Sequence, residues 1–179
     1  MRRMILLASL CCLVFSLAVS QPSKPYLSSY TFKPASLCAK NEKVVFSCVM
    51  QKTAKILSLC GSQELDAKKG YMQYRFGNPG KIELEYPAER KGTQSAFSYA
   101  RYTRPLVTYL ALRFETNGYK YSIHQDDVED IKPVVRESYI NITPPGKEAV
   151  EMKCRQPVNG SLMTLEDIVA KDDRDATEP

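Results

Sequence analysis

The sequence predicts an all-β fold, an antiparallel small barrel or sandwich with a short C-terminal helix. Three observations support this prediction. Apolar and polar residues alternate with a period of two along much of the chain, turn residues recur about every ten positions, and no long stretch between them has the 3.6-residue period of a helix. Short strands that follow one another at this spacing are typical of antiparallel sheets.

Residues 1–20 have the pattern of a secretory signal peptide. Arg2 and Arg3 precede an apolar run of 16 residues, and small residues stand at positions 18 and 20. The run is shorter than the roughly 20 residues of a membrane-spanning helix. We expect cleavage after Ser20 and a secreted or periplasmic protein without stable membrane insertion. An uncleaved anchor and a lipoprotein modified at Cys11 or Cys12 are the alternatives.

The net charge of the chain argues against one class of protein, the nucleic-acid-binding proteins. Removing residues 1–20 takes two arginines from a chain of formal net charge +5 and leaves 159 residues at +3. This charge is too small and too evenly mixed to indicate a nucleic-acid-binding protein. We expect an extended lead-in or linker over residues 21–34, a single β domain over 35–170 and a disordered tail over 171–179.

Two hairpins are the clearest elements. Residues 81–86 alternate charged and apolar side chains, and residues 70–76 precede them across the turn sequence Gly77-Asn78-Pro79-Gly80. The second hairpin joins residues 106–116 to residues 119–124 through Asn117-Gly118, a pair that favours a type I′ turn.

The remaining strands follow from weaker alternation and from turn residues between them. They are expected at residues 43–49, 55–60, 95–104, 134–142 and 149–153. Pro105 either divides the tyrosine-rich stretch into two strands or marks an edge strand. Near the C-terminus, Ser161 or Thr164 could cap a short helix that runs through Leu165, Ile168 and Val169.

Four cysteines remain after cleavage, and in an oxidising compartment an even number indicates two disulfides rather than a metal site. They are Cys38, Cys48, Cys60 and Cys154, and no pair has the Cys-x-x-Cys spacing. Three pairings are open. We favour Cys48 with Cys60, which bracket a predicted hairpin, and Cys38 with Cys154, which would join the ends of the domain.

No residue pattern indicates catalysis, and we predict a protein that is not an enzyme and carries no metal or cofactor. A hydrolytic triad needs a base beside its nucleophile. The single histidine, His124, lies on the polar face of a predicted strand, and no sequence motif places a serine or cysteine nucleophile beside it. The acidic residues at positions 126, 127, 129 and 130 do not have the spacing of a calcium-binding loop, so we interpret them as a solvated turn.

Tyrosine is the unusual feature of the composition. Nine of the eleven tyrosines lie between Tyr71 and Tyr139. Tyr and Arg often anchor protein interfaces because they bring a large contact area and a polar tip, although tyrosine is also a good strand former. The densest stretch, residues 95–104, gives the candidate binding residues Ser98, Tyr99, Arg101, Tyr102 and Arg104.

This stretch resembles a motif of the bacterial periplasmic lysozyme inhibitors, small secreted β-barrels that block the catalytic cleft of a wall-degrading enzyme. The family pattern is Ser-Gly-x-x-Tyr, and Ser98 and Tyr102 match it, whereas Tyr99 replaces the glycine. The resemblance implies that Ser98 and Tyr102 reach toward catalytic carboxylates and that Arg101 or Arg104 supplies charge.

We therefore predict a secreted binding protein whose partner is another protein, such as a lysozyme-like enzyme or a toxin. It would act as an inhibitor or as an immunity protein. The alternative is a carrier of carbohydrate or lipid, which would need a cavity or an aromatic shelf. Secretion from a eukaryotic cell is a further alternative, because Asn141-Ile-Thr143 and Asn159-Gly-Ser161 are glycosylation sequons.

Overall fold

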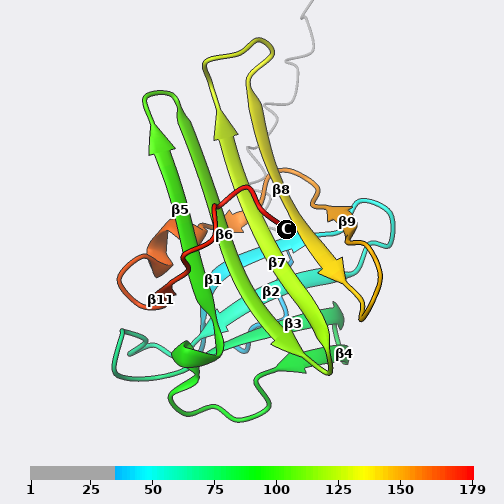
Figure 1. Ribbon diagram of the computed structural model, residues 1–179. Helices are drawn as coiled ribbons and strands as arrows, with labels where there is room; N and C mark the ends of the chain where they lie inside the picture. Colours follow the sequence, from blue (N-terminus) through cyan, green and yellow to red (C-terminus); the bar gives the residue numbers. More distant parts are fainter. Residues whose placement is uncertain (1–34) are drawn as a thin grey trace, which may run out of the picture. The chain divides into compact units, whose positions relative to one another are not determined.

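The computed structural model describes residues 35–179, and these residues form an all-β, sandwich-like fold of two sheets (Figure 1). The expected signal peptide and the lead-in at residues 21–34 lie outside the described residues. Within residues 35–179, no helix has the length and apolar character needed to cross a bilayer.

The first sheet has five strands in the order β10-β1-β2-β3-β4, all antiparallel. Its members are β1 (Lys43–Val49), β2 (Ile56–Gly61), β3 (Met72–Asn78), β4 (Lys81–Tyr86) and the short β10 (Asn159–Gly160). The turn at Gly77 and Gly80 joins β3 to β4, and both glycines have a positive φ. The hairpin expected from this turn sequence is therefore confirmed.

The second sheet has six strands in the order β11-β5-β6-β7-β8-β9. Its members are β5 (Ser98–Arg104), β6 (Val107–Thr116), β7 (Tyr119–Val128), β8 (Val135–Thr143), β9 (Val150–Lys153) and β11 (Ala170–Lys171). Only β11 runs parallel to its neighbour, β5. Asn117 and Gly118 both have a positive φ in the turn between β6 and β7, as the type I′ turn requires.

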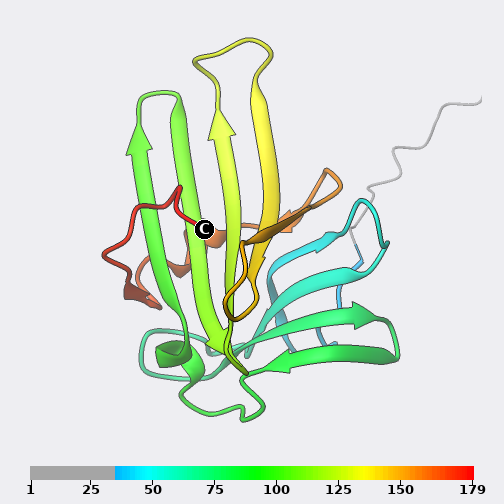
Figure 2. The same cartoon turned by 45° about the vertical axis from the view of Figure 1, so that its right-hand side comes forward.

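The core lies between the two sheets. Period-two alternation places Leu110, Leu112 and Phe114 of β6 on its inner face, where Phe114 lies 4.9 Å from Tyr74 of the first sheet. The strands of one sheet run across those of the other, so the long strands β5–β8 extend well beyond the first sheet at one end (Figure 2). At the opposite end they pack on it.

The C-terminal region differs from its sequence prediction. The predicted helix is only a 3-10 turn, η2 (Leu162–Leu165), although Ser161 does cap it by accepting a hydrogen bond from the Met163 N–H. The last residues, expected to be a disordered tail, pack on the outer face of the second sheet. Ala176 is buried there against Ala100 and Ala111, because this face offers small side chains beneath the segment.

The two disulfides are present, but the predicted pairing is wrong. Cys38 bonds Cys60, and Cys48 bonds Cys154. Cys48 in β1 and Cys60 in β2 cannot pair, because Cys48 lies opposite Leu57 in the ladder and Cys60 lies opposite Val44. The Cys48–Cys154 bond joins the first sheet to the residue that follows β9 in the second.

Candidate functional site

The exposed end of the second sheet is the candidate binding site. It consists of the distal parts of β5 and β6 with the turn between them (residues 101–110), and of β7 and β8 with the connection between them (residues 125–136) (Figures 1 and 2). Six large hydrophobic residues are exposed in the described part of the chain, and three of them, Tyr102, Leu106 and Ile131, lie at this end.

Leu106 occupies an unusual position in the β5–β6 turn. Arg104 pairs with Val107, so the turn has only two residues, Pro105 and Leu106. Proline suits the first of these positions, whereas the second needs a positive φ and normally contains glycine or asparagine. Leu106 has φ 65° and is 60% exposed. A left-handed leucine costs about 1–2 kcal/mol, so the turn presents an apolar side chain to solvent in a strained conformation.

Polar contacts join this turn to the neighbouring β7–β8 connection. The Glu129 N–H donates to the Leu106 carbonyl at 2.8 Å. Arg104 forms an ion pair with Asp130, with 2.6 Å between Nη1 and Oδ2. Because both contacts cross from one hairpin tip to the other, they restrict the motion of the tips relative to each other.

The structure separates the five residues predicted to bind. Arg101, Tyr102 and Arg104 are exposed. Ser98 instead donates to the Asp172 carboxylate at 2.7 Å, beneath the C-terminal segment. Tyr99 lies in the core, where burial raises the pKa of its hydroxyl to about 12. Only three of the predicted binding residues therefore belong to the exposed end.

These three side chains lie on both faces of β5. Arg101 is on the inner face, where it forms an ion pair with Glu166 and donates to the Thr103 hydroxyl. Tyr102 is on the outer face and stacks on Tyr109 of β6, with 6.1 Å between the ring centroids. The exposed end thus combines arginine, tyrosine and apolar groups, the residue types that anchor protein interfaces.

Sequence reasoning missed Leu106 and Ile131 as candidate binding residues. A signal was available for Leu106, since an apolar residue directly after Pro105, between two predicted strands, occupies a turn position that normally requires glycine or asparagine. No comparable local signal marks Ile131. Its place at the exposed end depends on the pairing of β7 with β6.

His124 is fully buried, contrary to the exposed position expected for it. Its Nε2 lies 2.7 Å from the Ser122 hydroxyl, and its ring stacks on Tyr139. Burial and the nearby positive charge of Arg113 lower the pKa of His124 to about 4, so the imidazole is neutral at pH 7. A neutral imidazole beside a hydroxyl can act as a general base that activates the hydroxyl as a nucleophile. In this structure the segment containing Ala176 covers His124 and Ser122.

The acidic residues at the end of β7 and directly after it are paired rather than freely solvated. Asp127 and Glu129 both contact Arg136, and Asp130 contacts Arg104. Burial raises the pKa of Asp126 to about 6, although Tyr139 donates a hydrogen bond to this carboxylate at 3.1 Å. These contacts give the acidic residues structural roles at the exposed end.

A pocket of about 390 Å³ lies at the other end of the outer face. Its lining combines charged side chains, among them Arg113, Lys120 and Arg174, with the aromatic rings of Phe97, Phe114 and Tyr121. The guanidinium of Arg113 is engaged by the C-terminal segment, since it donates to the carbonyls of Asp175 and Glu178 at 2.6 Å each.

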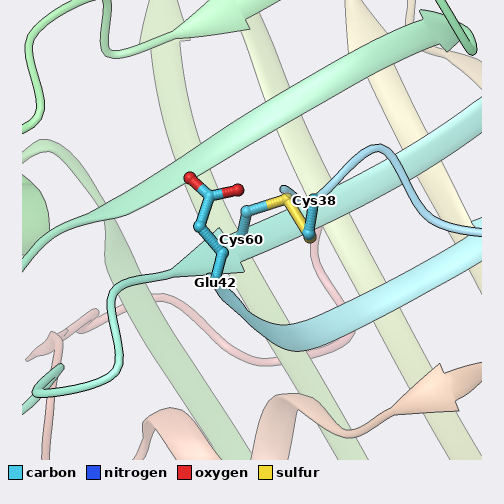
Figure 3. A group of neighbouring side chains, drawn as sticks. All are labelled: Cys38, Glu42 and Cys60. Carbon is cyan, nitrogen blue, oxygen red and sulfur yellow. A yellow bond between two sulfur atoms is a disulfide. The ribbon is translucent and has the colours of Figure 1, made fainter. Parts of the chain in front are cut away.

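Cys38, Cys60 and Glu42 form the one group of potential metal ligands found among residues 35–179 (Figure 3). The two sulfur atoms are joined in a disulfide, which removes the thiolates that bind metals. Glu42 accepts two hydrogen bonds from Arg75 and one from Tyr71. Burial alone would raise its pKa, but these bonds lower it to about 2. This group is a buried structural cluster.

Searches with the whole chain against protein-family models, curated proteins and solved structures find no match.

Proposed function

We propose that the protein is a secreted or periplasmic binding protein that acts without catalysis, as an inhibitor or immunity protein against a wall-degrading enzyme or a toxin. The exposed end enters the partner's cleft. The observation that carries this proposal is the strained, exposed Leu106 at the tip of two joined hairpins. Strained residues of this kind cluster at functional sites, where the surrounding structure holds them in place.

Charge at the exposed end fits such a partner. Enzymes that cleave glycosidic bonds commonly have two carboxylic acids in their clefts. Arg104 and Arg101 are exposed on either side of Tyr102, and each could exchange its present carboxylate partner for one in the cleft. The side chain of Leu106 would fill an apolar recess, and the two joined tips would enter as a preformed unit, which lowers the entropy cost of binding.

An oxidising compartment is consistent with this role. The two disulfides of the described domain indicate an environment outside the reducing cytosol. A wall-degrading enzyme or a toxin delivered to the periplasm would meet the protein there.

The test uses the mature domain, immobilised and exposed to purified lysozymes and to periplasmic proteins, followed by an assay of muramidase activity. We expect a captured enzyme to lose activity in proportion to the domain added. Leu106→Asn should weaken this binding by about 30-fold, the change expected when an anchor is lost. Asparagine tolerates the positive φ, so the variant should fold at least as stably as the parent.

Val150→Asn is the matched control. Val150 is as exposed as Leu106, at 57%, but lies on β9, away from the exposed end. Equal loss of binding in both variants, or inhibition that Leu106→Asn leaves unchanged, would refute the assignment of the site. If no enzyme is inhibited and mass spectrometry finds a retained sugar or lipid, the carrier function replaces this proposal.

A further inference from the structure

The outer edge of β5 is only partly covered. Its neighbour β11 pairs with Ser98 and Tyr99 alone, and the Asp172 N–H donates to the Tyr99 carbonyl at 2.8 Å at the end of this pairing. From Arg101 to Arg104 the side chains are exposed, and among residues 35–179 only β6 pairs with this part of the strand. Figure 1 shows this part of β5 at the margin of the sheet, beyond β11.

The direction of the backbone groups follows from the alternation of a strand. The Tyr99 carbonyl faces β11, and therefore faces away from β6. Every second residue of an antiparallel strand directs its N–H and C=O to the same side. Arg101 and Thr103 therefore direct one donor and one acceptor each toward the open edge, whereas Tyr102 directs its own pair toward β6.

We propose that a second copy of the chain pairs with this edge in antiparallel orientation, with a two-fold axis at Tyr102. In this register, Arg101 of each copy lies opposite Thr103 of the other. The two residue pairs exchange four backbone hydrogen bonds. The two Tyr102 side chains face each other across the axis on the outer face, where close cross-strand aromatic pairs stabilise a sheet.

The alternative registers are poorer. With the axis at Arg101, two arginines lie opposite each other, and directly opposed like charges are destabilising. With the axis at Thr103, Arg101 lies opposite Pro105, which belongs to the turn rather than to the strand. The axis at Tyr102 uses all four outward groups of Arg101 and Thr103 and opposes no like charges.

Charge does not protect this edge from pairing. Natural sheet edges are commonly guarded by unpaired charges, bulges or proline. On β5, Glu166 neutralises Arg101 and Asp130 neutralises Arg104. The edge can therefore accept a strand without bringing net positive charges together.

Thr103→Pro tests the pairing with little change to the monomer. Proline removes the outward N–H of Thr103 and leaves the ladder to β6 intact, and edge strands tolerate proline for this reason. Thr103→Ala keeps the N–H and is the matched control. Sedimentation equilibrium of the mature domain, from about 5 to 500 µM, should show a dimer whose dissociation constant rises at least about tenfold in Thr103→Pro and changes less than about twofold in Thr103→Ala.

Hydrogen exchange of the parent gives a measurement that needs no variant. The amides of Arg101 and Thr103 should exchange more slowly as concentration rises, while that of Tyr102 stays slow throughout. A parent that is monomeric over the whole range, or a Thr103→Pro variant that folds and dimerises like the parent, would overturn the pairing.

The pairing and the proposed function can fail separately. Leu106→Asn tests the tip and leaves the four backbone hydrogen bonds of the pairing in place, whereas Thr103→Pro tests the edge. If the parent is monomeric and Thr103→Pro loses binding to an inhibited enzyme, the edge serves that enzyme rather than a second copy.

Discussion

The arginine of the first sheet and those at the exposed end of the second differ in burial and in the number of their partners. Arg75 is buried beneath residues 37–42 and bonds Glu42, Gln73, Glu85 and a backbone carbonyl. Arg101 and Arg104 are exposed and form one ion pair each. A buried charge needs every partner in place, and its network is therefore structural. An exposed pair contributes little to stability, so its members remain available for binding.

The largest expected effect concerns the disulfide that joins the two sheets, Cys48–Cys154. Replacing both Cys48 and Cys154 by Ala should lower the free energy of unfolding by nearly 5 kcal/mol, because the bond closes a long loop in the unfolded chain. The corresponding change at Cys38 and Cys60, which close a shorter loop, should cost about 3 kcal/mol. Urea unfolding of both double variants measures the difference, and an equal loss in the two would contradict the loop argument.

Breaking the buried arginine network should have a similar but somewhat smaller effect. Glu42→Gln leaves the Arg75 charge buried without its main partner, so we expect a loss of about 3–5 kcal/mol. Glu83→Gln removes the exposed pair with Lys55 and should cost less than about 1 kcal/mol. Similar unfolding midpoints for these two variants would contradict the claim that the buried ion pair stabilises the fold and the exposed ion pair does not.

Two titratable residues on the outer face of the second sheet, His124 and Asp126, should have opposite effects on the pH dependence of stability. The pKa of His124 is below its unfolded value, so stability is lost as pH falls from about 6.5 to 4. The pKa of Asp126 is above its unfolded value, so stability is gained as pH falls from about 6 to 4. In the parent these two changes largely cancel.

Asp126→Asn should separate the two contributions. At pH 7 the variant should be more stable than the parent by about 2–3 kcal/mol, since it no longer buries a charge, and this advantage should disappear as pH falls to 4. Denaturant unfolding at several pH values checks this expectation. A constant difference between the two proteins from pH 7 to pH 4 would contradict it.

The smallest expected effect on stability is at the exposed end. Arg104→Ala removes an exposed ion pair with Asp130 and should leave the urea midpoint of unfolding nearly unchanged. The same substitution should weaken binding to an inhibited enzyme by about tenfold or more. Lys55→Ala, which removes an exposed pair on the first sheet, is the control and should leave that binding unchanged.

Local patterns in the sequence were sufficient to predict most of the strands. The alternation over residues 81–86 and the Asn117-Gly118 turn each predict a hairpin that the structure contains. Such signals succeed because side chains one or two positions apart determine which face of a strand is apolar. The predicted C-terminal helix failed because its apolar residues pack through a single 3-10 turn.

Three of the five candidate binding residues at the exposed end could be identified in the same way. Arg101, Tyr102 and Arg104 are exposed as the composition of their strand suggested. Ser98 and Tyr99 are not available, and the reason is non-local. A carboxylate 74 residues later in the chain engages Ser98, and the packing of the first sheet against the second encloses Tyr99.

By itself, the sequence determined the class of fold, the positions of most strands and the presence of two disulfides, because each depends on residue types at short spacing or on a count. The tertiary structure decided which cysteines pair, which face of the second sheet the C-terminal segment covers, and which end of β5 stays open to solvent. These outcomes depend on contacts between residues far apart in the chain, and local alternation carries no information about the order of strands in a sheet.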